Sequence, residues 1–436
     1  MADISRNASL VYGVIAAGGA IGAPALAART GLSQPSVSRA LTEVNAEIGL
    51  LIIRSGRSIS YAIGRHVKSL PMDIPIHQIH GDGSSSLAGT LTAISGGGYL
   101  FRAIEGSQLF DGLPWFLHDM RAQGYLGRAF CHAKNEELGL SPRLLDWSDD
   151  DALYAMAQYG SDLPGNLLVG AMALRQSREL AVRTGDYDAI ALESMSAATP
   201  GSSAGGEHPK FVLGDRIVKF SPTYGSELST RWRDLLIAEH IAAETMRNAG
   251  IAAPVTRIIE SEQRCYLESE RFDRTSTGRR CVASLMAIDG EFIGQHRSWV
   301  SSAESLHADG MIGDACLQSI RTAHIFGRLI GNTDMHLGNL AFFWSGAPTR
   351  PDLSLAPIYD MLPMLYAPEN GEIIERAFCC PDITGEPEDV KAMALSMANE
   401  FWGAMQTANV SDKFKGVAAR HLAAIPFPPE PPVMAI

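Results

Sequence analysis

Cysteine is scarce in this sequence: six cysteines stand among 436 residues, and none forms a CxxC pair. Zinc ribbons and disulfide frameworks need cysteines at characteristic spacings, so we expect neither of them, and we expect free thiols in a reducing cytoplasm. No window approaches the ~20 consecutive apolar residues that a membrane-spanning helix requires. The N-terminus carries Asp3 and lacks a basic segment followed by an apolar core. We therefore expect no secretory signal and no membrane contact.

Charge is sparse and unevenly distributed. Charged residues make up 19% of the chain and apolar residues 46%, which is the composition of a folded protein. Residues 1–70 hold seven Lys or Arg residues against three acidic residues. Their net charge is thus +4, which leaves −16 for the remainder of a chain whose total is −12. Because nucleic acid is polyanionic, we expect only this basic head to meet it.

The length predicts two to four domains. We divide the chain into a head at 1–67, a second region at 68–195, a third region at 196–425 and a Pro-rich tail at 426–436. In the second region, Tyr99–Ile104 is predicted as a strand, and the Asp run at 149–151 is predicted to start a helix. The cluster at 81–86 is predicted as a linker or loop.

The head has the pattern of three helices followed by a hairpin. The helices are expected at Leu10–Ala17, Ala23–Thr30 and Gln34–Glu47, and the strands at Leu51–Ile53 and Ser58–Ile63. Ala27, Gly31 and Val37 have the spacing of a helix-turn-helix, with a small residue at the helix contact, a glycine in the turn and an apolar anchor. The head is therefore predicted to be a winged helix-turn-helix.

Several side chains of the head are suited to DNA. The candidates are Gln34, Ser36, Ser38 and Arg39 on the last helix, and Arg54 and Arg57 on the hairpin. Such side chains reach base edges from the major groove or contact phosphates. A helical packing or dimerisation domain is the alternative. We favour DNA binding because fold, charge and exposed residue types agree, and since such proteins often dimerise on two half-sites, we expect a homodimer.

The strongest chemical signal is the segment Gly331–Asn339, which follows an apolar helix. Asp334 stands five positions before Asn339, the spacing of a kinase catalytic loop. There the aspartate accepts the proton of the attacking hydroxyl, and the asparagine holds magnesium. Downstream, the apolar segment at 358–359 ends in Asp360, an acid that can chelate the metal bridging the phosphates. An aspartate five positions before an asparagine is by itself a weak signal, because this spacing occurs by chance in many chains.

The upstream half of the chain strengthens the kinase hypothesis. Lys219 lies in a β-rich run, and Glu239 follows 20 residues later on a long predicted helix. A lysine beside nucleotide phosphates needs a carboxylate to fix it. The Gly-rich segment at 202–210 precedes both, and its glycines let backbone N–H groups approach phosphates. Singly, these are more often a linker and a surface ion pair, but their order along the chain is that of kinases.

These motifs together resemble the HipA family of toxin kinases. The resemblance lies in SSAGGEHPK at 202–210, VKF at 218–220, ERFDR at 270–274, GNTDMHLGN at 331–339 and PIYD at 357–360. It covers roughly residues 90–425, so the helix-turn-helix lies outside it. The chain looks like the YjjJ-like branch, in which such a head precedes the kinase. The resemblance implies a two-lobed, protein-kinase-like fold that phosphorylates protein serines or threonines. Together with the winged head, this predicts an α+β chain.

The resemblance also implies roles for individual residues and two cofactors, ATP and Mg²⁺. The implied roles are Asp334 as catalytic base, Asn339 and Asp360 as magnesium ligands, and Lys219, fixed by Glu239, as the phosphate-binding lysine. The other nucleotide-binding residues are Ala204, Gly205, Gly206, Glu207, Lys210, Glu270, Arg271, Phe272, His336 and Tyr359, with the adenine hinge at Glu270–Phe272. Family members phosphorylate a serine of the Gly-rich loop in their own chain, which here is Ser202 or its rival Ser203.

The implied partners are a protein substrate, DNA and an antitoxin. Well-known targets of the family are aminoacyl-tRNA synthetases, whose phosphorylation arrests growth. In one departure, Gly338 stands where many family members have a lysine, and His336 offers a partial substitute. Two alternatives remain open: a transcriptional regulator whose kinase-like body only senses a nucleotide, and a toxin that acts directly on DNA.

Overall fold

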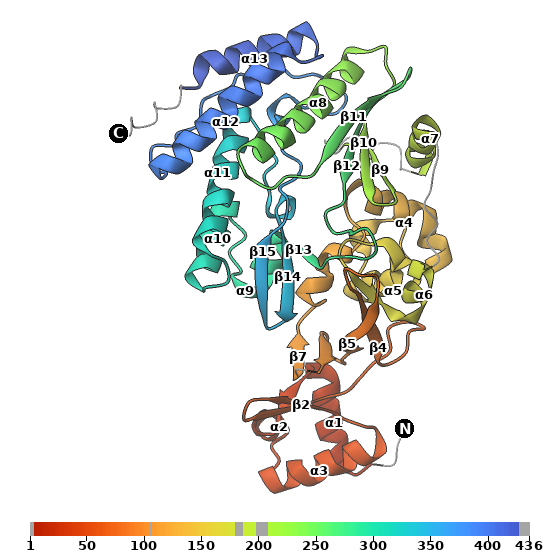
Figure 1. Cartoon of the computed structure of the whole chain (residues 1–436). Coiled ribbons are helices and arrows are strands. Elements are labelled where there is room, and N and C mark those ends of the chain that lie inside the picture. Colours follow the sequence, from red (N-terminus) through yellow and green to blue (C-terminus); the bar gives the residue numbers. More distant parts are fainter. Residues whose placement is uncertain (1–3, 105, 179–185, 198–207, 427–436) are drawn as a thin grey trace.

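The head consists of three helices and three short strands (Figure 1). In the computed structural model, which describes residues 4–104, 106–178, 186–197 and 208–426, they are α1 (Arg6–Gly18), β1 (Ile21–Gly22), α2 (Ala23–Thr30), α3 (Gln34–Glu47), β2 (Leu51–Ser55) and β3 (Ser58–Ala62). The strands form an antiparallel sheet in the order β1-β3-β2. The predicted bounds of α2 and α3 are confirmed.

Local chemistry sets the turn between α2 and α3. Gly31 caps α2 with a φ of +69°, a backbone conformation that costs glycine little. Ser33 then caps α3 by accepting the Ser36 N–H, and Pro35 stands in the first turn, where its missing N–H costs no helical bond. Val37 is fully buried, which confirms its expected role as an apolar anchor.

The head packs directly on the second region. Ile53 of β2 and Ala62 of β3 form one buried apolar cluster with Ile94 and Leu100. Beside this cluster, Asp150 accepts hydrogen bonds from Arg65 and, at 2.5 Å, from the Tyr99 hydroxyl. Hydrophobic burial and a charge-assisted network thus both hold the head against the body.

The second region is built on a five-stranded antiparallel sheet in the order β7-β6-β5-β4-β8. Its elements are β4 (Ile74–Ile79), β5 (Ser85–Ala93), β6 (Tyr99–Ala103), β7 (Gly106–Phe110), η1 (Trp115–Met120), α4 (Gly124–Leu138), α5 (Asp149–Tyr159), β8 (Leu167–Val169) and α6 (Gly170–Arg178). The strand expected at Tyr99–Ile104 is confirmed within one residue. The predicted helix start is confirmed too, because Ser148 and Asp151 form a capping box at α5. The cluster at 81–86 contains the turn between β4 and β5 rather than a linker.

A four-stranded antiparallel sheet in the order β11-β12-β10-β9 follows. It comprises β9 (Lys210–Leu213), β10 (Arg216–Phe220), β11 (Thr256–Glu260) and β12 (Cys265–Glu270), with the long helix α8 (Glu227–Asn248) between β10 and β11. Helix α7 (Tyr187–Ala197) contributes Ile190 and Ala191 to a buried cluster with Phe211 and Phe220 of this sheet. Helix α8 contributes Leu236 to a second buried cluster with Cys265 and Leu267 of β12, so both α7 and α8 pack on the sheet.

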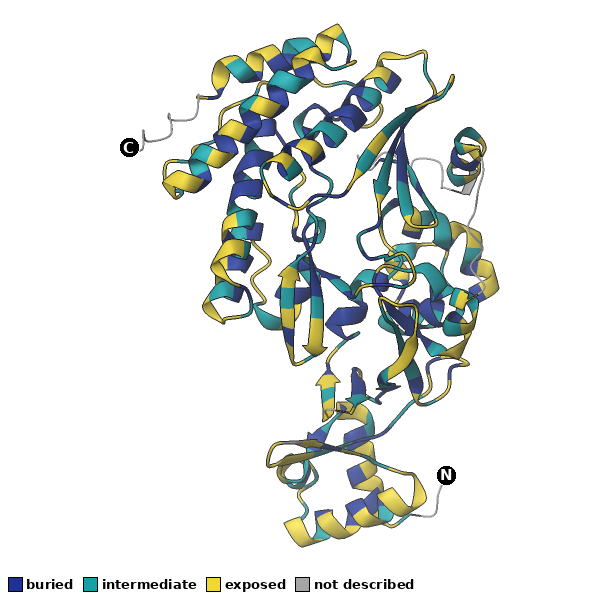
Figure 2. Cartoon of the chain, viewed as in Figure 1, coloured by how far each residue is buried: buried dark blue, intermediate teal, exposed yellow. Residues whose placement is uncertain are grey.

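The remainder is mainly helical and lies on the far side of α8 in Figure 1. It contains α9 (Leu285–Phe292), α10 (Trp299–Ala308), α11 (Asp314–Ile330), α12 (Glu388–Thr407) and α13 (Asp412–Ala424), with a small antiparallel sheet of β13 (Val282–Ser284), β14 (Ala341–Ala347) and β15 (Arg350–Leu355). One large apolar core runs from the second region to α13, as the buried faces in Figure 2 show. The mixed α and β architecture is as predicted. Among the described residues, no helix is both long and apolar enough to cross a membrane.

Candidate functional site

A buried lysine lies at the centre of the candidate site. Lys219 of β10 contacts Glu239 of α8, with its Nζ 2.6 and 2.7 Å from the two carboxylate oxygens. The two residues are only 6% and 7% exposed. A carboxylate that binds with both oxygens on a rigid helix fixes the direction of the lysine. The structure therefore brings this predicted pair together.

Asp360 contacts the same lysine from a distant part of the chain. Its Oδ1 lies 2.7 Å from the Lys219 Nζ, and its backbone has a φ of +55°, which is strained for a residue other than glycine. Burial alone would raise the pKa of Asp360, but the charges of Lys219 and Lys210 and the hydrogen bond from Lys219 together hold that pKa well below its usual range. Burial would lower the pKa of Lys219, but the charges of Asp360 and Glu239 and their hydrogen bonds together keep it above its ordinary value, whereas burial raises the pKa of Glu239. We infer that Lys219 and Asp360 are both charged.

The segment with Asp334 begins where α11 ends. Gly331 caps α11 with a φ of +81°, so that the chain turns sharply. The Asn332 side chain then accepts from the Asp334 N–H at 3.0 Å and donates to the Asp360 carbonyl at 3.3 Å. The Asn339 amide donates to the Asp334 carbonyl at 2.7 Å. These bonds hold the loop beside Asp360, while Asp334 itself is exposed.

His336 is held by its own loop. Its Nδ1 accepts the Gly338 N–H at 3.0 Å, and its carbonyl accepts from the Trp299 indole at 2.8 Å. A Cβ at position 338 would lie 2.8 Å from the imidazole ring. A lysine at 338 would therefore displace His336 from this position.

The Gly-rich segment is only partly described. Lys210 stands directly opposite Lys219 in the β9–β10 ladder, so both side chains leave the same face of the sheet. Ser202, Ser203, Ala204, Gly205, Gly206 and Glu207 lie outside the described residues. At this end of the site, the structure thus describes two lysines and two carboxylates, Glu239 and Asp360.

The predicted adenine hinge is largely engaged in bonds within the protein. Glu270 forms an ion pair with Arg216 at 2.5 Å. The backbone N–H groups of Glu270 and Arg271 donate to the carbonyls of Val255 and Asp215, both at 2.9 Å. An adenine contact made by this segment would have to use its carbonyl groups or the N–H of Phe272.

The Arg271 side chain is also occupied. It binds Asp273 at 3.2 Å and, from the second region, Asp162 at 2.9 Å. These carboxylates hold the pKa of Arg271 above its ordinary value although burial alone would lower it. Phe272 stacks on Tyr359, with ring centroids 5.7 Å apart, and the Tyr359 hydroxyl donates to the Gly338 carbonyl at 2.7 Å. This segment therefore joins the second region to the loop of Asp334.

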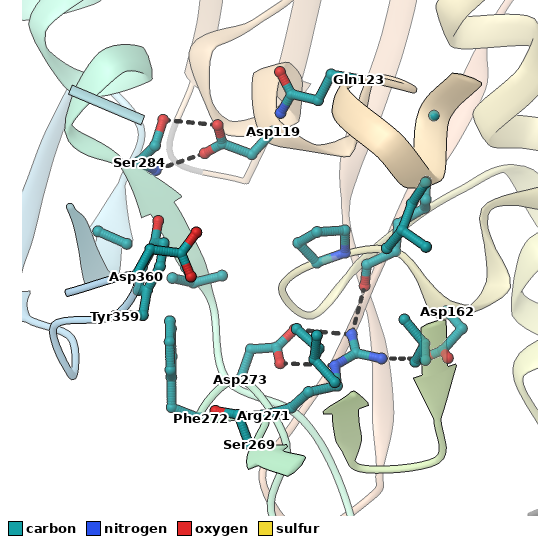
Figure 3. A pocket seen from close by; sticks show the side chains of 18 of the residues that line it. Asp119, Gln123, Asp162, Ser269, Arg271, Phe272, Asp273, Ser284, Tyr359 and Asp360 are labelled. Carbon is teal, nitrogen blue, oxygen red and sulfur yellow. Dashed lines mark hydrogen bonds and ion pairs between the residues drawn. The ribbon is translucent and has the colours of Figure 1, made fainter. Parts of the chain in front are cut away.

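A cavity of about 670 Å³ lies beside Lys219 and the hinge, and its volume is typical of small-molecule sites. Lys210, Asp334, His336 and Asn339 are not among its lining residues. Its lining includes Lys219, Glu239 and Asp360. In Figure 3, Asp119 and Ser284 lie near Tyr359 and Asp360, and Arg271 with its two aspartates lies on another side.

The second region lines one side of the cavity, and the sequence motifs did not predict this. Asp119 of η1 lines the cavity and accepts from the Ser284 N–H at 2.5 Å and from the Ser284 hydroxyl at 2.7 Å. Asp162 lines it too. No local motif marks either residue, since their partners lie more than 100 positions away.

The donor set fits a magnesium–nucleotide complex in part. Asp360 offers a carboxylate beside a fixed lysine. Asn339 uses its amide nitrogen to donate to the Asp334 carbonyl, so this bond does not occupy its side-chain oxygen, the atom type that magnesium prefers. Among the described residues, no three His, Cys, Asp or Glu side chains gather into a metal site. Bound nucleotide phosphates and water would supply the remaining ligands, as is usual for magnesium.

The predicted DNA-contacting side chains lie on the surface of the head. Gln34, Ser38 and Arg39 of α3 are exposed and Ser36 is partly exposed, whereas Arg54 and Arg57 are exposed on the β2–β3 hairpin. The surface of α3 and the β2–β3 hairpin therefore carry exposed polar and basic groups.

Comparisons with known proteins place this architecture among HipA-like toxins. The HipA-like C-terminal domain matches residues 202–425, and the middle domain of YjjJ-like toxins matches residues 70–178. The toxin YjjJ of Escherichia coli K12 is 32% identical over 420 residues, covering 91% of this chain and 93% of that protein. The chain therefore belongs to the HipA family of toxins, in its YjjJ-like branch, as the sequence motifs predict.

The fold agrees with this assignment. A chain in the Shewanella oneidensis MR-1 complex of the toxin–antitoxin proteins HipA and HipB with operator DNA superposes with a TM-score of 0.54. The match covers 81% of this chain and 95% of that chain at 14% sequence identity. The predicted HipA-like fold is thus confirmed.

Proposed function

We propose that this toxin is an ATP- and magnesium-dependent serine/threonine protein kinase. The observation that carries the proposal is the contact of one buried lysine, Lys219, with both Glu239 and Asp360 at the edge of a cavity of nucleotide size. A lysine fixed by a helix carboxylate and set beside an acid from a following loop is the arrangement that protein kinases use on ATP phosphates. Bound Mg²⁺ would neutralise the charge on the transferring phosphate.

In this proposal the chain's own residues position the reacting groups. Lys219, fixed by Glu239, binds phosphate oxygens, and Asp360 with Asn339 holds the metal. Asp334, exposed at the loop, accepts the proton of the substrate hydroxyl. The target is a translation-related protein, with aminoacyl-tRNA synthetases as candidates, and Ser202 or Ser203 is the site of autophosphorylation.

The first experiment incubates the purified chain with γ-labelled ATP, Mg²⁺ and cell extract, and then maps phosphoserines and phosphothreonines. The Asp334→Asn variant should lose label on extract proteins and on Ser202 and Ser203, while its melting temperature stays unchanged. Asp309→Asn, at the end of α10, is the matched control. Equal labelling by wild type and Asp334→Asn would contradict the kinase proposal.

We further propose that the head is a winged helix-turn-helix that binds DNA as a homodimer. Support comes from its +4 charge, from the exposed residues of α3 and from the basic hairpin. The Shewanella complex contains HipA, HipB and operator DNA. In the YjjJ-like branch, the head of the toxin itself would bind the operator, with or without a separate antitoxin. Arg39→Ala and Arg57→Ala should each lower the salt dependence of DNA binding by about one counterion for each phosphate that the variant no longer binds. Arg143→Ala, exposed on the body, is the control.

A transcriptional regulator with a nucleotide-sensing body remains the second candidate. The observation that favours it is Gly338, because the loop offers no lysine there and a side chain would collide with His336. A chain that binds ATP and represses transcription, yet transfers no phosphate and arrests growth equally with Asp334→Asn, would establish this alternative. For the third candidate, a toxin acting on DNA, the measurement is cleavage of DNA by the purified chain without ATP.

A further inference from the structure

His208 is a buried polar residue close to the lysines of the candidate site. It precedes β9 and is only 6% exposed, and its Nε2 has no hydrogen-bond partner. The ring lies against Trp232 of α8, with ring centroids 4.2 Å apart. A buried donor or acceptor without a partner is unfavourable, so such an atom calls for a ligand or another explanation.

The β-ladder places His208 on the side of the sheet that carries the lysines. The ladder that pairs Lys210 with Lys219 continues through a 3.1 Å bond from the Phe220 N–H to the Pro209 carbonyl. Side chains alternate along a strand, so His208, two positions before Lys210, faces the same way as both lysines.

Helix α8 supports the same placement. Trp232, which contacts His208, and Glu239, which contacts Lys219, are seven residues apart and so lie two turns apart on one face of α8. His208 and Lys219 are therefore neighbouring contacts between one face of the sheet and one helix. The charges of Lys219, Lys210 and Asp360 all reach the His208 ring.

We propose that His208 binds a phosphate group of the nucleotide, with its Nε2–H donating to a phosphate oxygen beside Lys219 and Lys210. This inference rests on the proposed ATP-dependent function and adds a residue to it. Phosphate oxygens accept hydrogen bonds, so Nε2 carries the proton of the neutral ring in the complex. Burial and the two lysines lower the pKa of His208 well below its usual value, which keeps the ring a neutral donor.

The test compares ATP with adenosine. The His208→Phe variant keeps a ring against Trp232 but removes the nitrogen, whereas His208→Gln restores a neutral hydrogen-bond donor. Dissociation constants for Mg-ATP and for adenosine are measured by calorimetry on the full chain, and thermal melting checks folding. His324→Phe is the matched control, because His324 is also a largely buried histidine near a tryptophan with an unpartnered ring nitrogen.

We expect His208→Phe to weaken Mg-ATP binding about tenfold while the affinity for adenosine changes less than twofold. His208→Gln should recover most of this loss, and His324→Phe should bind both ligands as wild type does. If His208→Phe binds Mg-ATP as tightly as wild type, or loses affinity for ATP and adenosine equally, the inference is overturned and the kinase proposal stands. If the wild-type chain binds no ATP, both fall together.

Discussion

The Lys219 Nζ and the Asp360 Oδ1 are 2.7 Å apart, although 141 positions separate the two residues in the sequence. The same Nζ binds both oxygens of Glu239. One cation therefore lies between two buried carboxyl groups, which would repel each other if both were charged without it. Any change that removes this cation exposes that repulsion.

We expect Lys219→Met to abolish phosphoryl transfer and to destabilise the fold by about 3–5 kcal/mol at pH 8, because it leaves Glu239 and Asp360 without their counter-ion. With the cation gone, one carboxylate takes up a proton as pH falls, so the deficit should shrink between pH 8 and pH 5. Chemical denaturation at both pH values measures it. The control is Lys413→Met, which removes an exposed pair with Glu227 and should change stability by less than about 1 kcal/mol. A deficit that grows towards pH 5 would contradict this expectation.

A second prediction concerns the contact between the second region and the hinge. Asp162 binds Arg271 at 2.9 Å and Arg274 at 2.7 Å. Asp162→Asn would leave these buried guanidinium groups with less compensating charge. Because Asp162 is partly exposed, we expect a loss of about 1–3 kcal/mol in stability and a several-fold rise in the KM for ATP with a smaller change in kcat. The control is Asp146→Asn, which alters an exposed ion pair with Arg143 and should change neither the stability nor the KM for ATP.

Buried histidines should make stability depend on pH. Burial lowers the pKa of His421 to about 3, whereas the unfolded chain binds the proton near pH 6.5. The unfolded state therefore takes up a proton that the folded state refuses, and stability falls as pH drops from about 6.5 to 3. One such histidine gives a slope of about 1.4 kcal/mol per pH unit. His421→Gln should flatten the slope of the unfolding free energy between pH 6 and pH 4 by this amount, and an unchanged slope would refute the assignment.

Two glycines of the head should respond oppositely to alanine. Gly31 has a φ of +69° at the end of α2, so Gly31→Ala should destabilise the head by about 1 kcal/mol through backbone strain. Gly13 lies within α1, and a Cβ there meets no atom within 4 Å. Gly13→Ala should therefore stabilise α1 by about 0.5–1 kcal/mol. Denaturation of each variant, followed by helical circular dichroism, separates the two effects, and equal signs would contradict this interpretation.

The predictable parts of the fold are those with local causes. The bounds of α2 and α3 follow from Gly31, Ser33 and the apolar spacing, all within a few residues. Lys219 and Asp360 are visible because each stands in a short motif, and Glu239 because it follows on a long predicted helix. Sequence spacing indicates which side chains kinase chemistry needs, and folding then brings those three together.

The second region's share of the cavity could not be predicted. Asp119 and Asp162 acquire their roles from partners more than 100 positions away, and no local pattern marks such contacts. The hinge shows the same limit. Glu270 and Arg271 match the family motif, but their N–H groups are already bonded to Val255 and Asp215, which only the folded chain reveals.

The junction of the head with the body has a geometric consequence. Ile53 and Leu100 share one apolar cluster across it, and Arg65 and Tyr99 both bind Asp150. Because these contacts hold the head on the body, DNA bound by the head would set the orientation of the cavity. For two copies on paired half-sites, inserting five base pairs between those sites would rotate one body by about half a helical turn relative to the other. Operator spacing would then control which way the two cavities point.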